Sequence, residues 1–156
     1  MLKNNTKRTE GFTIIEVLIV LAIAGLILLI VFLAVPALQR NSRNTQVKNG
    51  AASVLGAVNE YVNSNNGALP TGGSISPTDG TITITGAGTQ ASGKTQGGYT
   101  LNFAGTVPTQ PGVFSVALNR KCNGNALATG NTPRAVAILY AVETSGTAVA
   151  GQCTET

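Results

Sequence analysis

The residue types that most enzymes use for catalysis are scarce in this chain of 156 residues. It contains no His, its one Asp is Asp79, and three of its acidic residues lie far apart at Glu60, Glu143 and Glu155. No nucleophilic side chain has an evident general base, and two cysteines are too few for a zinc-ligand set. We therefore expect no enzymatic activity, no catalytic residues, no metal site and no other cofactor.

One segment fits a nucleotide-binding pattern literally. Residues 88–95 read GTQASGKT, which matches the GxxxxGK[ST] pattern of phosphate-binding loops. Such a loop follows a strand and opens a helix whose N-terminus holds the phosphates. Here residues 96–99, QGGY, make a poor helix start, and no Asp for magnesium follows a later strand. We interpret the match as a chance feature of a segment rich in Gly, Ser and Thr.

Glu16 is the most unusual charged residue, because it lies near the start of a long apolar run. Residues 17–38 contain no charge, and as a helix they are about 33 Å long, close to the hydrocarbon thickness of a bilayer. A carboxylate within a membrane is costly, so its presence indicates a functional partner. The alternative is that Glu16 lies in the headgroup zone, where it costs little.

A short polar leader with Lys3, Lys7 and Arg8 precedes the apolar run. A secretory signal has a shorter apolar core followed by a small-residue cleavage site, and residues 34–37, AVPA, are a poor version of one. We expect the run to remain as a membrane helix with its amino end in the cytoplasm. Three positive charges soon after the run weaken this orientation signal.

Residues 11–16, GFTIIE, resemble the processing site of type IV prepilins, whose common form is GFTLIE. Four features agree in order: the basic leader, Gly11, the Phe12 that follows it, and a Glu five residues into the mature chain. The apolar run that follows also matches. Beyond it, the chain is similar to pilins in layout, with a helix, a β-rich head and a C-terminal cysteine pair.

The resemblance implies a leader peptide of residues 1–11, cut by prepilin peptidase between Gly11 and Phe12 on the cytoplasmic face. The new amino group of Phe12 would be N-methylated. Glu16 would then face the Phe12 ammonium of a neighbouring subunit in a filament. Because a buried carboxylate without a partner is heavily penalised, a cation supplied in trans would compensate it and set the axial register.

The helix is predicted to have two halves, a transmembrane or filament-core half at 12–38 and an amphipathic half at 39–66. Apolar residues in the second half recur at three- and four-residue spacing, which predicts a stripe that packs on a sheet. Gly50 and Gly56 either weaken the helix or permit close packing. The stripe consists of Val47, Ala51, Val54, Leu55, Val58, Tyr61 and Val62.

Residues 67–156 are predicted to form a β-rich globular head. The Gly-, Ser-, Thr- and Pro-rich stretch 67–98 is expected to be a loop with one short strand at 81–85. Stronger strand patterns follow at 99–103, at 113–118 and at 135–142, and the last is apolar enough for a central strand. Three or four antiparallel strands on one helix face predict an α+β fold, with the long N-terminal helix on a small antiparallel sheet.

Cys122 and Cys153 bracket the last of these strand patterns. A cysteine pair in an exported domain indicates a disulfide, and the alternative is two reduced, buried thiols. In pilins a disulfide-closed C-terminal segment often forms part of the exposed surface, so the resemblance also implies this bond. Nothing in the loop residues indicates receptor binding.

These features predict a structural subunit of a type IV pilus, serving adhesion, motility or DNA uptake. It would be a single-pass prepilin in the inner (cytoplasmic) membrane and then join an extracellular filament. Its partners would be copies of itself, prepilin peptidase and the pilus assembly platform, with the membrane around it before assembly.

Three alternatives remain. A pseudopilin of a type II secretion system would carry the same leader. A DNA-receptor pilin is weakly supported by the formal net charge of +4, since no basic patch is interleaved with aromatics. An exposed basic cluster at Arg120, Lys121 and Arg134 would favour that reading. The simplest alternative is a single-pass anchored protein.

Overall fold

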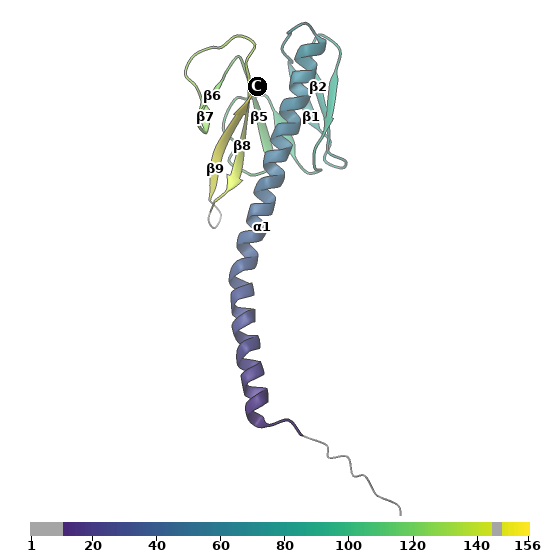
Figure 1. The fold of residues 1–156 in the computed structure, drawn as a ribbon. Helices are drawn as coiled ribbons and strands as arrows, with labels where there is room; N and C mark the ends of the chain where they lie inside the picture. The colour runs from purple at the N-terminus through teal and green to yellow at the C-terminus, as the bar shows by residue number, and fades with distance from the viewer. Residues whose placement is uncertain (1–10, 145–147) are drawn as a thin grey trace, which may run out of the picture. The chain divides into compact units, whose positions relative to one another are not determined.

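The computed structural model describes residues 11–144 and 148–156, so the basic leader at residues 1–10 lies outside the described residues. Within these ranges a single helix, α1 (Ile14–Ser64), is followed by nine strands (Figure 1), which confirms the α+β class. The chain divides into two compact units, one ending at Gln39 and the other comprising Arg40–Thr156. The strands are β1 (Gly72–Ile75), β2 (Thr81–Thr85), β3 (Ala91–Lys94), β4 (Thr100–Asn102), β5 (Val113–Leu118), β6 (Cys122–Asn123), β7 (Ala126–Leu127), β8 (Val136–Glu143) and β9 (Val149–Glu155).

A four-stranded sheet with the order β4-β5-β8-β9 makes up most of the head. The strand predicted at 113–118 is β5, and β8 is central, as its apolar sequence predicts. β8 pairs antiparallel with both β5 and β9, whereas β4 pairs parallel with β5, with Leu101 opposite Phe114. The sheet is therefore mixed and not wholly antiparallel.

The connection between β4 and β5 explains the parallel pair. After β4 the chain runs back across the face of the sheet that points away from the helix. β5 therefore starts at the same end of the sheet as β4. On that face the backbone N–H of Thr106 donates to Ser115 Oγ at 3.2 Å. A Cβ atom on Gly151 of β9 would lie only 2.5 Å from Val107 Cγ1, so glycine lets this crossover lie flat on the sheet.

The prediction of one strand in residues 67–98 is wrong, because β1, β2 and β3 form a three-stranded antiparallel sheet there. β2 coincides with the predicted strand, and Ile82 and Ile84 are fully buried. β1 and β3 read GGSI and ASGK, so neither shows alternating apolar residues. Backbone hydrogen bonds to β2 hold them, and small residues allow close approach, as at Gly73 beside the Thr83 carbonyl.

The core forms where α1 packs on both sheets. The predicted apolar stripe is confirmed, although Leu55 and Val62 are half-buried and Gly50 and Ala57 also belong to the buried face. The opposing residues come from five strands of the two sheets. They are Ile75 of β1, Ile82 and Ile84 of β2, Ala91 of β3, Phe114 and Val116 of β5, and Val136, Ile138, Tyr140 and Val142 of β8.

Polar contacts join the helix to the end of β8. The Asn44 amide donates from Nδ2 to the Glu143 carbonyl and accepts the Glu143 N–H, both at 2.8 Å, and so pairs as a neighbouring strand would. The Arg43 guanidinium donates to both oxygens of the Glu143 carboxylate, at 2.6 and 2.9 Å. These bonds from Arg43 lower the pKa of Glu143. Arg40 donates to the Thr144 carbonyl.

Gly50 and Gly56, the two glycines in the second half of α1, predict opposite effects of substitution by alanine. A Cβ atom on Gly50 would lie 2.7 Å from Phe114 Cζ and 2.9 Å from Tyr99 Cε2, two rings that pack edge to face. Overpacking of this kind costs about 1–3 kcal/mol, more than the roughly 1 kcal/mol that alanine gains in a helix. Gly50→Ala is therefore expected to lower the melting temperature of the chain in detergent, followed by circular dichroism.

Gly56→Ala is the matched control. Gly56 is exposed and a Cβ atom there would meet nothing within 4 Å, so the helix gain of up to about 1 kcal/mol should appear as a higher melting temperature. Equal stabilisation by both substitutions would show that the rings of Phe114 and Tyr99 leave room for a side chain at position 50.

Candidate functional site at the start of the helix

The candidate site is the first turn of α1 together with the residues before it. Thr13 is the residue that caps the helix, and its carbonyl accepts the first helical hydrogen bond, from Val17 N at 3.4 Å. The Glu16 carboxylate accepts the Thr13 N–H at 2.8 Å and the Thr13 hydroxyl at 2.7 Å. In return Thr13 Oγ1 accepts the Glu16 N–H at 3.4 Å. This reciprocal arrangement is a capping box.

Gly11 and Phe12 lie outside the helix and are exposed. Phe12 is 88% exposed, and a Cβ atom added to Gly11 would meet nothing within 4 Å. The peptide bond between them thus belongs to an open, non-helical segment. Such a segment is accessible to a protease, whereas the amides of a helix are closed by hydrogen bonds.

Glu16 is not an isolated carboxylate, because Thr13 supplies two donors to it. Sequence reasoning singled out Glu16 and did not include Thr13. The signal that identifies Thr13 is present, since T-x-x-E directly before an apolar run is the sequence signature of a capping box. The pairing of Glu16 with the Phe12 ammonium of another subunit stays a prediction.

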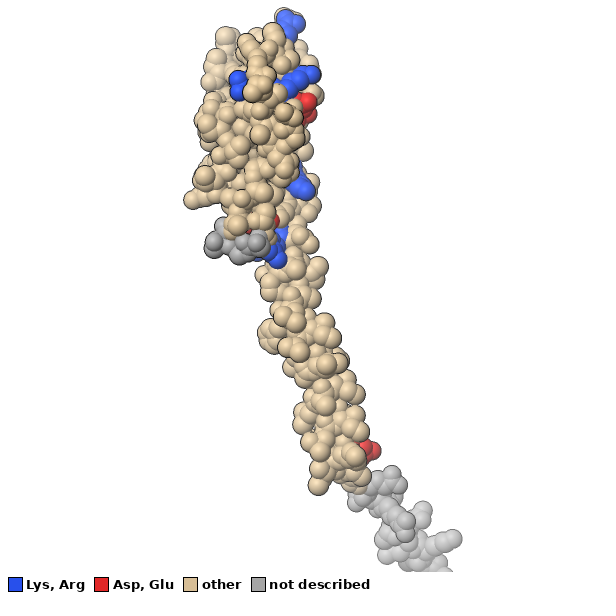
Figure 2. Space-filling model, turned by 90° about the vertical axis from the view of Figure 1, so that its left-hand side faces the viewer, with Lys and Arg blue, Asp and Glu red and all other residues tan. Residues whose placement is uncertain are grey.

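The apolar half of α1 is exposed around its whole circumference. Every residue from 12 to 39 is exposed, including large side chains such as Leu26, Ile30 and Phe32. Figure 2 shows this stretch as a surface almost free of charged side chains. Within residues 11–144 and 148–156, α1 is the one helix long and apolar enough to cross a membrane. A surface of this kind has to be covered by lipid or by protein.

An exposed apolar helix that begins within a GFTIIE sequence indicates a membrane anchor with a prepilin-type signal. In particular, residues 6–32 match the family model described as the prokaryotic N-terminal methylation motif. The prepilin resemblance is therefore confirmed at the N-terminus, where the chain carries a prepilin-type methylation motif. Proteins with this motif are structural. Among curated proteins and solved structures none matches the chain significantly.

The segment that resembles a phosphate-binding loop lies against the end of α1. Its Gly88 N–H donates to the Tyr61 hydroxyl, and its Thr89 N–H donates to Asn65 Oδ1 at 2.7 Å. Residues 91–94 continue as β3, and β4 follows them where a helix would be needed. A Cβ atom on Gly88 would collide with the Asn65 side chain, so this glycine has a packing role. Among the described residues no cluster of three metal-ligating side chains occurs.

The three basic residues that bear on DNA binding differ in exposure. Lys121 and Arg134 are exposed, whereas Arg120 is half-buried. The Arg134 guanidinium lies beside Gly67, just past the end of α1. On the face of the head in Figure 2, the Lys and Arg side chains lie apart in several groups. This arrangement does not single out DNA as a partner.

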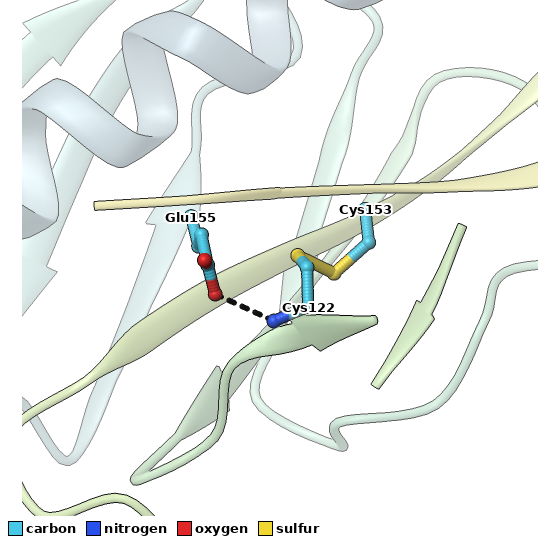
Figure 3. The surroundings of a disulfide bond; sticks show 3 residues. All are labelled: Cys122, Cys153 and Glu155. Carbon is cyan, nitrogen blue, oxygen red and sulfur yellow. Dashed lines mark hydrogen bonds between the residues drawn. A yellow bond between two sulfur atoms is a disulfide. The ribbon is translucent and has the colours of Figure 1, made fainter. Parts of the chain in front are cut away.

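A disulfide joins Cys122 to Cys153 (Figure 3). It connects the small β6–β7 hairpin to β9, the edge strand of the larger sheet. The Cys122 N–H also donates to the Glu155 carboxylate at 2.6 Å, so two links hold the hairpin at this edge. The hairpin thereby covers some of an edge that would otherwise present unpaired backbone groups.

Removal of the disulfide is expected to destabilise the head. The chain-entropy model assigns about 3–4 kcal/mol to a loop of this length. Replacing both cysteines by Ser should lower the melting temperature in detergent, and amides of residues 122–128 should exchange hydrogen faster than those of β8. Wild type with reductant should match the variant, and the variant itself should not respond to reductant. An unchanged melting temperature would contradict a stabilising role.

Proposed function

We propose that the chain is the subunit of a type IV pilus, made as a single-pass membrane prepilin and polymerised through its N-terminal helix. The observation that carries the proposal is the fully exposed apolar half of α1, which begins at Ile14 within the GFTIIE sequence of the matched motif. A helix of this kind fits lipid before assembly and fits like helices in a filament core.

Processing is the first step of the proposed function. Prepilin peptidase cuts between Gly11 and Phe12 on the cytoplasmic face, and the new Phe12 amino group is methylated. The exposed, non-helical backbone at Gly11 and Phe12 supports access of the peptidase to this bond. The mature chain then carries Glu16 as its one charged side chain before Arg40.

Assembly is the second step. Lipid is as apolar as the helix, so transfer of the helix from lipid to a bundle gains little from the hydrophobic effect, and packing and polar contacts have to supply the specificity. Glu16 is the one acidic residue available for this in the apolar half. Its carboxylate pairs with the Phe12 ammonium of a neighbouring subunit, and the pair sets the axial register of the helices.

The test of the proposed function is the intact mass of the protein recovered from sheared cell-surface material, with and without reductant. The expected chain starts at Phe12, carries one added methyl group and gains two hydrogens on reduction. A processed chain found only in membranes would favour the type II secretion pseudopilin. A chain that still starts at Met1 would leave a plain anchored protein.

The charge pair predicts that Glu16→Ala lowers incorporation into filaments relative to the amount of processed variant in the membrane. When it is co-expressed with tagged wild type, the ratio of variant to wild type in sheared filaments should fall roughly tenfold below the ratio in membranes, which corresponds to about 1.4 kcal/mol.

Glu60→Ala is the matched control, because it removes an exposed carboxylate from the same helix within the head. It should enter filaments in proportion to its amount in the membrane. Equal incorporation of both variants would exclude the charge pair as the assembly determinant.

A further inference from the structure

The side chains of Thr13 and Glu16 fix the residue at which α1 begins. If the helix extended towards the N-terminus, the Glu16 N–H would bond to the Phe12 carbonyl, and the Ile15 N–H would bond to the Gly11 carbonyl. Instead, Thr13 Oγ1 accepts the Glu16 N–H, and the Glu16 carboxylate holds the Thr13 N–H. The helix therefore begins at Ile14 and leaves Gly11 and Phe12 free.

We propose that the capping box of Thr13 and Glu16 presents the bond between Gly11 and Phe12 to the peptidase, with Thr13 as the positioning residue. This inference rests on the proposed function. In the cleavage, water adds across the amide. The Gly11 carbonyl carbon gains the hydroxyl group and becomes a carboxylate, and the Phe12 nitrogen leaves with the protons as an ammonium.

The geometry of hydrolysis explains why the helix has to stop here. The attacking water approaches the Gly11 carbonyl from one face of the amide plane, and a protease has to bind the carbonyl oxygen and protonate the nitrogen. A helical Gly11 carbonyl would be engaged by the Ile15 N–H, and the next turn would cover one side of it. In the capped chain Gly11 lies before the first helical residue, in open space.

The two functions assigned to Glu16 require different properties of its side chain. Capping needs an acceptor for the Thr13 N–H and hydroxyl, which lie at 2.8 and 2.7 Å, and the amide oxygen of Gln also provides one. Pairing with an ammonium needs the negative charge. Thr13 contributes its hydroxyl to the cap and carries no charge. Substitution of Thr13 therefore tests presentation of the bond to the peptidase, and removal of the Glu16 charge tests assembly.

The experiment follows cleavage of the full-length chain in membranes by a prepilin peptidase, with time, by mass spectrometry. Thr13→Val keeps the shape of the side chain and removes the hydroxyl, so the rate is expected to fall roughly three- to tenfold, as loss of a helix cap implies. Thr13→Ser restores the cap and should be cut at the wild-type rate. Glu16→Gln should also be cut at that rate and yet fail to enter filaments.

Hydrogen exchange of the Ile15 amide in detergent provides a second readout. It should be slower in Thr13→Val, because an extended helix bonds this amide to the Gly11 carbonyl, and it should be unchanged in Thr13→Ser. Cleavage of Thr13→Val at the wild-type rate, or equal slowing by Ser and Val, would overturn the positioning role while the proposed function stands. Failure of the peptidase to cut the wild-type chain would instead overturn the proposed function and this inference with it.

Discussion

The buried face of α1 between residues 47 and 61 is the surface on which both sheets of the head assemble. β2 contributes its two buried isoleucines to this face, and β5 and β8 contribute their inward-facing rows. Gly50 shows how closely the surfaces meet, because the edge-to-face rings of Tyr99 and Phe114 occupy the space that its side chain would need. The head is thus organised by one helix face, and the polar bonds of Asn44 to Glu143 hold that face in register with β8.

The apolar half of the same helix has no such partner among the described residues of the chain. Its side chains are exposed on every face, so lipid or further helices have to supply the packing that the sheets supply for residues 47–61. A carboxylate in this setting is expensive unless it is hydrogen-bonded. Thr13 meets that requirement within the chain, which leaves Glu16 satisfied in a single subunit and still negatively charged for a partner in trans.

Different interactions cover the edges of the two sheets in the head. The β6–β7 hairpin is held at the β9 edge by the disulfide and by the bond from Cys122 to Glu155. β1 and β4 contact one another, so the two sheets meet along these strands. The proposed polymerisation through the helix would benefit from covered edges, because they reduce unintended pairing between the heads of neighbouring copies.

The amino-acid sequence alone determined the motif at residues 11–16, the uncharged run at residues 17–38, the apolar stripe and the strands β5 and β8. These features depend on charge and on local spacing, which a sequence displays directly. Even the cap at Thr13 was present as T-x-x-E. Tertiary structure decided the strands β1 and β3 and the parallel pairing of β4 with β5. It also decided the hydrogen bonds of the Asn44 side-chain amide to the backbone of Glu143 in β8. Their physical basis is backbone hydrogen bonding and close approach at glycines between distant segments, and neither leaves a periodic pattern of side chains.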